Sequence, residues 1–179
     1  LMCWFTMYSQ TQKDSLVSIW VNTTITDSLR FKAIKDYYYK NTYAKPDSVI
    51  TLTNYHYQLG KEKGVVKEMA SALNERSYAH YIKGDLNRSI EVLKQSISLF
   101  EKINETKNLV VIQSNLGSIY AQQGNNKKAL EYLERAMEFI EESGNIPYIA
   151  ALSQNIGFIY YDEGKLVQAL EYLNKSLKL

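Results

Sequence analysis

The chain has 179 residues, of which 45% are hydrophobic and 22% charged, which is typical of a folded globular protein and excludes an intrinsically disordered one. The formal net charge is only +2, so composition gives no support for binding nucleic acid or a strongly acidic partner. Tyrosine is unusually common, with 15 residues, and the two prolines are as few as an all-helical protein requires.

The first nine residues, LMCWFTMYS, are apolar and uncharged. A run of this length is too short to span a bilayer, but it fits the end of a secretory signal peptide. We therefore expect residues 1–9 to be a signal-peptide remnant, and the alternative is a segment that covers the first helices. Cys3 is the only cysteine, so no disulfide can form within these residues. Residues 10–26 are polar and lack helical periodicity, and we interpret them as a linker or an N-terminal cap.

From residue 27 onwards the sequence predicts helices separated by short breaks. Asp27 is placed to begin a helix that reaches about Tyr43, and Pro46 suits the first turn of the next. Later breaks are expected at Gly84, Gly124 and Gly164. Each of these three glycines is expected to mark the turn within one unit, and the four units are expected at residues 27–64, 65–104, 105–144 and 145–179.

The last two units repeat each other at an offset of 40 residues. Residues 115–136 read NLGSIYAQQGNNKKALEYLERA, residues 155–176 read NIGFIYYDEGKLVQALEYLNKS, and ten of the 22 aligned positions are identical. Gly84 and Ala44 continue the frame towards the N-terminus. A repeat of this length is typical of a solenoid, in which each unit buries its apolar face against its neighbours.

Glycine recurs inside helices as well as at the breaks. Gly117 and Gly157 fall in the middle of predicted helices, where glycine costs roughly 1 kcal/mol relative to alanine. We expect the following helix, with the small residues Ala129 and Ala169, to approach closely at these points.

The repeat resembles the tetratricopeptide repeat (TPR), whose first helix carries an L-G-x2-Y core and whose second carries A-x3-F. The residues that carry the resemblance are Leu116-Gly117-x2-Tyr120, Ile156-Gly157-x2-Tyr160, Ala129-x3-Leu133 and Ala169-x3-Leu173. The sequence departs from the pattern because the signature Trp and Pro are absent and the unit is 40 residues long instead of 34. The resemblance implies an all-α fold, a TPR-like alpha-solenoid of about four antiparallel hairpins, about eight helices, in a right-handed superhelix.

The sequence offers no catalytic constellation. His56 and His80 are the only histidines, no set of His, Cys and acidic residues has metal-ligand spacing, and no glycine-rich loop could cradle a phosphate. We therefore expect no enzymatic activity, no metal and no cofactor.

The resemblance implies that the first helix of each unit lines a concave groove that binds a peptide or a segment of another protein. Asn115 and Asn155 match the asparagine that bonds the backbone of a bound peptide in peptide-binding TPRs, although the N-L-G pattern is also common repeat consensus. Amide and aromatic side chains suit an extended peptide, because they bond its backbone and stack on its side chains. The positions expected to face the groove are Lys35, Tyr38, Asn74, Tyr78, Tyr81, Ser114, Asn115, Ser118, Gln122, Gln154, Asn155, Phe158, Tyr161 and Asp162.

The 40-residue unit is also similar to the TPR sensory regions of bacterial signalling proteins, namely sensor histidine kinases and helix-turn-helix regulators. This similarity implies a periplasmic or otherwise extracytoplasmic sensor, with a kinase or DNA-binding domain further along the same chain. The alternatives are a cytoplasmic regulator that senses a peptide and a free-standing scaffold in a protein assembly. No direct nucleic-acid binding and no membrane span within these residues are expected. Because the last helix has no polar cap, we expect the array to continue or another chain to cover it.

Overall fold

The computed structural model describes residues 15–141 and 144–178, so the expected signal-peptide remnant at residues 1–9 lies outside the described part. The described residues form nine helices and no strands. The helices are α2 (Ser15–Val21), α3 (Asp27–Asn41), α4 (Pro46–Glu62), α5 (Val66–Ile82), α6 (Leu86–Lys102), α7 (Thr106–Gln122), α8 (Asn126–Glu141), α9 (Ile146–Asp162) and α10 (Leu166–Leu177).

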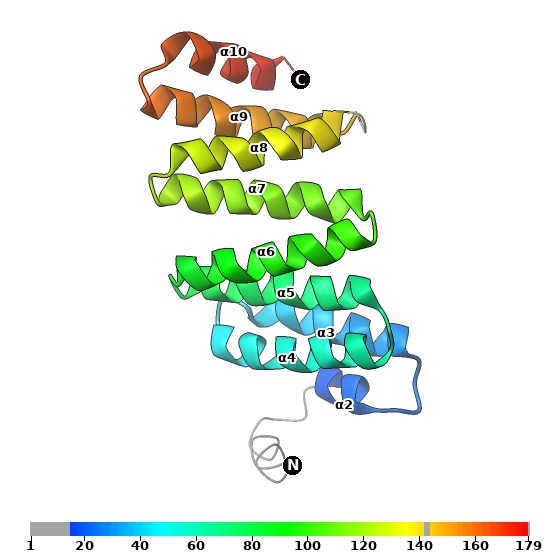
Figure 1. Ribbon diagram of the computed structural model, residues 1–179. Coiled ribbons are helices and arrows are strands. Elements are labelled where there is room, and N and C mark those ends of the chain that lie inside the picture. Colours follow the sequence, from blue (N-terminus) through cyan, green and yellow to red (C-terminus); the bar gives the residue numbers. More distant parts are fainter. Residues whose placement is uncertain (1–14, 142–143, 179) are drawn as a thin grey trace.

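The helices stack in chain order into an elongated array, with α2 at one end and α10 at the other (Figure 1). The closest packing is within three antiparallel hairpins, α5 with α6, α7 with α8 and α9 with α10, and between α4 and α5, and each hairpin also packs on the next. Such stacking gives each hairpin the partner that it needs to bury its apolar face. The predicted all-α solenoid is therefore confirmed.

A left-handed residue follows most helices at a constant spacing of 20 residues. These residues are Gly64, Gly84, Asn104, Gly124, Gly144 and Gly164, with φ between 53° and 79°. One residue in this conformation ends a helix and reverses the chain, and glycine adopts it without a Cβ clash. The 40-residue repeat therefore consists of two similar steps of helix and turn, a regularity that the 40-residue pattern did not predict.

The first unit departs from the frame. Ala44 occupies the turn position of Gly84, and the only non-glycine residue with positive φ in the described chain is Asn104. Without the left-handed turn, α3 and α4 touch at few points, and α4 instead lies along α5. Residues 27–64 thus do not form a hairpin like the three that follow.

Helix α2 occupies part of the segment for which no helix was expected. Its Trp20 is only 3% exposed, and its ring meets the edge of Tyr37 on α3 at 5.3 Å. The Trp20 carbonyl accepts hydrogen bonds from Arg30 Nε at 2.8 Å and from the Tyr55 hydroxyl at 3.1 Å. The absence of a helix was wrongly predicted here: Leu16, Ile19 and Trp20 have the i, i+3, i+4 spacing of a helix, and the contacts of Trp20, which are distant in sequence, stabilise it.

The close approach predicted at the helical glycines is confirmed. A Cβ on Gly117 would lie 2.7 Å from Leu133 Cγ and 3.0 Å from the Ala129 carbonyl oxygen. Leu133 and Ala129 are fully buried, so α7 and α8 fit together only because Gly117 has no side chain. None of the described helices is long and apolar enough to cross a membrane.

Candidate functional site

Helices α5, α7 and α9 each begin a closely packed hairpin, and they carry most of the predicted groove residues. Their exposed and half-buried side chains form a surface that we call the first-helix face. It comprises Asn74, Glu75, Tyr78, Tyr81, Ser114, Asn115, Ser118, Gln122, Gln154, Asn155, Phe158, Tyr161 and Asp162.

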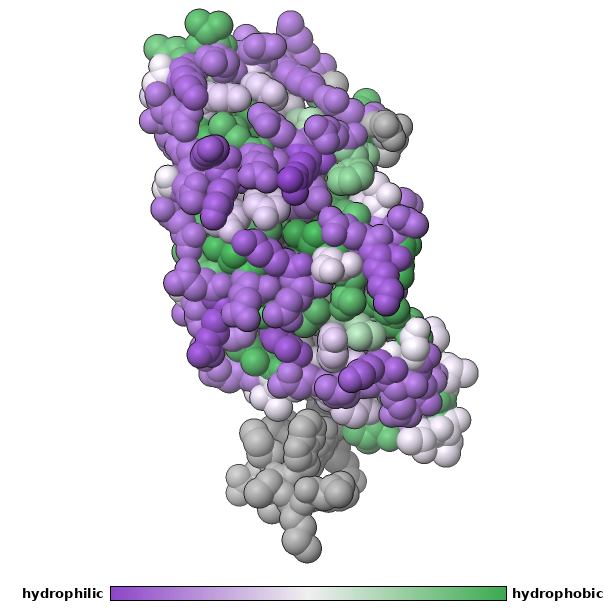
Figure 2. Space-filling model, viewed as in Figure 1, coloured by the Kyte–Doolittle hydropathy of each residue, from purple (hydrophilic) through white to green (hydrophobic). Residues whose placement is uncertain are grey.

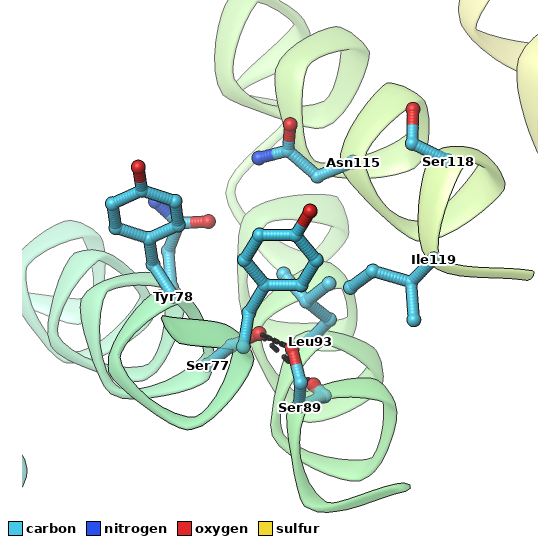
Figure 3. Close-up of a pocket in the computed structure, with 9 residues that line it drawn as sticks. Ser77, Tyr78, Ser89, Leu93, Asn115, Ser118 and Ile119 are labelled. Carbon is cyan, nitrogen blue, oxygen red and sulfur yellow. Dashed lines mark hydrogen bonds between the residues drawn. The ribbon is translucent and has the colours of Figure 1, made fainter. Parts of the chain in front are cut away.

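A pocket of about 150 Å³ opens on this face, where α5, α6 and α7 meet (Figure 3). Five of the predicted groove residues line it: Asn74, Tyr78, Tyr81, Asn115 and Ser118. In Figure 3, the side chains of Tyr78 on one helix and Asn115 on another lie on opposite sides of the opening. Amide, hydroxyl and aromatic groups thus converge on one concave site, as a site for a polar ligand requires.

The floor of the pocket contains residues that were not predicted as part of the site. The Ser77 hydroxyl donates to the Ser89 carbonyl at 3.0 Å and lies 2.8 Å from the Ser89 hydroxyl. Leu93 and Ile119 supply its apolar lining. Ser77 and Ser89 occupy the frame positions of Gly117 and Ala129, so a small polar pair replaces the glycine–alanine contact of the next hairpin.

Three tyrosines form a cluster beside this pocket. The Tyr43 and Tyr78 hydroxyls are hydrogen-bonded, and their rings meet edge to face at 5.9 Å. The Tyr78 and Tyr81 rings are nearly parallel, with centroids 6.2 Å apart, and Gln122 Nε2 donates to the Tyr81 hydroxyl at 2.7 Å. The hydrogen bond with Tyr43, together with burial, raises the pKa of Tyr78 to about 12. These contacts link α5 to α7 and hold the rings in fixed positions.

The remaining predicted residues lie outside the pocket. Phe158 and Tyr161 on α9 are 50% and 61% exposed and extend the aromatic surface beyond α7. Their neighbours on the face are exposed or half-buried polar side chains, namely Ser114, Gln154, Asn155 and Asp162.

The two predicted groove residues on α3, Lys35 and Tyr38, both contact a buried network around His56. Tyr38 is 1% exposed, and its hydroxyl lies 3.1 Å from Nδ1 of the fully buried His56. His56 Nε2 donates to Glu68 at 2.9 Å, and Lys35 Nζ donates to the same carboxylate at 2.8 Å. Tyr38 is therefore a core residue, and its prediction as a groove residue was wrong because the first unit does not follow the frame from which it was made. Lys35 is exposed, and its ammonium is paired with Glu68.

Protonation of this buried network is opposed by its environment. Burial lowers the pKa of His56, and this effect outweighs the opposing hydrogen bond to Glu68. Burial alone would raise the pKa of Glu68, but hydrogen bonds from His56 and Lys35 lower it overall. The network thus holds a neutral imidazole beside an ionised carboxylate. No cluster of three His, Cys, Asp or Glu side chains in the described part of the chain could hold a metal ion.

Comparison with protein families agrees with this architecture. Two models that describe the tetratricopeptide repeat match residues 68–142 and residues 150–179, which together make up more than half of the chain. The chain belongs to the tetratricopeptide repeat family. TPR folds are typically non-catalytic scaffolds for protein–protein interaction, so the expected role as a binding array is supported at this level. No curated protein matches the sequence.

Solved TPR-like structures share the fold. Aspartyl phosphate phosphatase F from Bacillus subtilis is 22% identical with a TM-score of 0.74, over 93% of this chain and 41% of that one. BtubC (BKLC) from P. vanneervenii is 13% identical with a TM-score of 0.77, over 93% of this chain and 69% of that one. A kinesin light chain from Podosopora anserina is 15% identical with a TM-score of 0.62, over 97% of this chain and 80% of that one. At these identities the likeness shows the fold alone, and this chain spans less than half of the first structure.

Proposed function

We propose that this chain binds an extended peptide, or an extended segment of another protein, along its first-helix face. The observation that carries the proposal is the pocket between α5 and α7, where Asn115 faces a fixed cluster of tyrosines. A side-chain amide can donate to a peptide carbonyl and accept from a peptide N–H, whereas the rings offer stacking surfaces for side chains. Phe158 and Tyr161 lengthen this surface over the next hairpin, as an extended ligand requires.

Peptide arrays test this proposal directly. The purified chain is applied to an array of random heptapeptides, and retained peptides are titrated against it in solution. Replacing Tyr78 and Phe158 together by alanine should weaken binding at least tenfold. The matched control is Phe139→Ala, because Phe139 is an exposed aromatic residue on α8, a second helix of its hairpin. Equal losses in both variants, or no retained peptide, would contradict the proposal.

We further propose that the binding array is the sensory region of a bacterial signal-transduction protein and works outside the cytoplasm. This proposal is supported by the similarity of the 40-residue unit to such regions and by the uncharged apolar run at residues 1–9. A reporter enzyme that is active only after export, fused behind the natural full-length coding sequence up to Leu179, tests it. Activity that disappears when two lysines are placed within residues 1–9 supports export, and an inactive fusion indicates a cytoplasmic protein.

A further inference from the structure

Glu75 lies on α5 between Asn74 and Tyr78, which both line the pocket. Glu75 on α5 is half-buried, and its one hydrogen bond is a long contact of 3.5 Å from the amide of Asn74, which itself lines the pocket. No Lys, Arg or His of the described residues forms an ion pair with it. A half-buried charge without a partner is costly, so this position is suited to a ligand that supplies the missing cation.

The surroundings of Glu75 match a planar cation. Glu75 precedes Tyr78 by three positions on α5, so the two side chains lie on the same face of the helix. Aromatic faces attract a guanidinium, and a carboxylate accepts two parallel hydrogen bonds from it. Burial raises the pKa of Glu75, as expected of a carboxylate that lacks a neighbouring positive charge.

The nearby cations are engaged elsewhere. Lys35 occupies the equivalent frame position on α3, but its ammonium is held by Glu68 at 2.8 Å. Arg76, the next residue on α5, donates to the Thr53 hydroxyl at 3.0 Å. In the two later hairpins the frame position of Glu75 holds the neutral amides Asn115 and Asn155. At this frame position the array therefore carries one acidic residue, which is followed by two amides.

We propose that Glu75 and the ring of Tyr78 form a subsite for an arginine side chain of the extended peptide that the first-helix face binds. The arginine lies against the tyrosine cluster, and the peptide backbone continues past Asn115 towards α9. This inference rests on the proposed peptide-binding function and specifies its ligand. The two ends of the face then bind different side chains of the peptide: Glu75 binds a positively charged one, and Phe158 and Tyr161 bind apolar ones.

The test uses heptapeptide pools with acetylated and amidated ends and with no Lys, Arg or His outside one varied position, so that arginine at that position is the only source of positive charge. Three sets of pools differ at one position, which is arginine, its neutral isostere citrulline, or glutamate. The wild-type chain should prefer arginine over citrulline by about tenfold, or about 1.4 kcal/mol. Glu75→Gln should abolish this preference while binding of the citrulline pools persists, and Glu75→Arg should favour the glutamate pools. Glu62→Gln, at an exposed site on α4, is the matched control.

The outcomes separate the two proposals. If no pool binds the wild-type chain, peptide binding itself is wrong and the subsite falls with it. If pools bind without preference for arginine, or if the preference survives in Glu75→Gln, only the arginine subsite is overturned. Circular dichroism of each variant shows whether its helices are intact, so that a loss of preference is not confused with unfolding.

Discussion

Replacing Gly117 by alanine should destabilise the array, whereas the same change at Gly157 should not. In the middle of a helix, glycine to alanine alone stabilises by about 1 kcal/mol. At Gly117 the added methyl would lie 2.7 Å from Leu133 Cγ and 3.0 Å from a backbone oxygen, and Leu133 is fully buried. Overpacking of this kind typically costs about 1–3 kcal/mol. We therefore expect a net loss of about 1 kcal/mol.

Gly157 is the matched control because it occupies the same position one unit later. Its added methyl would lie 2.8 Å from Leu173 Cγ, but the nearest backbone atom there is 3.3 Å away. Leu173 is only half-buried on α10, so its side chain can move aside. The helix preference for alanine should then prevail, so that Gly157→Ala is neutral or stabilises by up to about 1 kcal/mol.

Urea unfolding followed by circular dichroism at 222 nm measures both changes. A double-mutant cycle adds a second test, because Leu133→Ala removes the side chain that the new methyl at Gly117 would strike. Leu133→Ala alone should destabilise by about 2–5 kcal/mol, and the pair should be less destabilised than the sum by at least about 1 kcal/mol. Equal effects at Gly117 and Gly157, or additive effects within the cycle, would refute the packing argument.

Three other features lead to separate predictions. Asn104→Gly should raise the free energy of unfolding by roughly 0.5–1 kcal/mol, seen as a higher urea midpoint, because Asn104 has φ of 53° and glycine adopts this conformation more readily. Folding lowers the pKa of His56, so the unfolded chain binds a proton more readily, and the free energy of unfolding should fall as the pH drops below about 6.5. In the His56→Gln variant, the urea midpoint should decline less over the same pH range. Arg30→Ala should release α2, and the emission of Trp20 in a Trp4→Phe background should shift to the red.

The regular part of the fold could be predicted because it is specified by single residues and by patterns that are local in the sequence. Gly124 and Gly164 mark turns by backbone conformation alone, and Gly117 marks a close contact by the absence of a side chain. The first unit could not be predicted in this way. The burial of Trp20 and Tyr38 depends on contacts with residues 10 to 35 positions away, and no local pattern indicates them.

The site was only partly predictable for a related reason. The repeat frame identified the side chains at the rim of the pocket, such as Tyr78 and Asn115, because these follow from helix periodicity. The floor was missed because Ser77 and Ser89 align with the packing residues Gly117 and Ala129. The alignment itself could have indicated the floor, because Ser77 and Ser89 place two hydroxyl groups where the next hairpin has a glycine and an alanine, and two hydroxyl groups in contact indicate a hydrogen bond.

Packing positions between the helices and exposed positions on the first-helix face also differ in how they vary along the array. Leu93 recurs as Leu133 and Leu173 in the second helices, because every hairpin must fill the same space between its helices. On the first-helix face, the frame position of Tyr78 changes with every hairpin, as Tyr, Ser and Phe, and that of Glu75 changes once, from Glu to Asn and Asn. Packing does not require these changes, because the side chains are partly or largely exposed. A regular scaffold whose exposed side chains vary between hairpins is suited to recognising a linear ligand residue by residue.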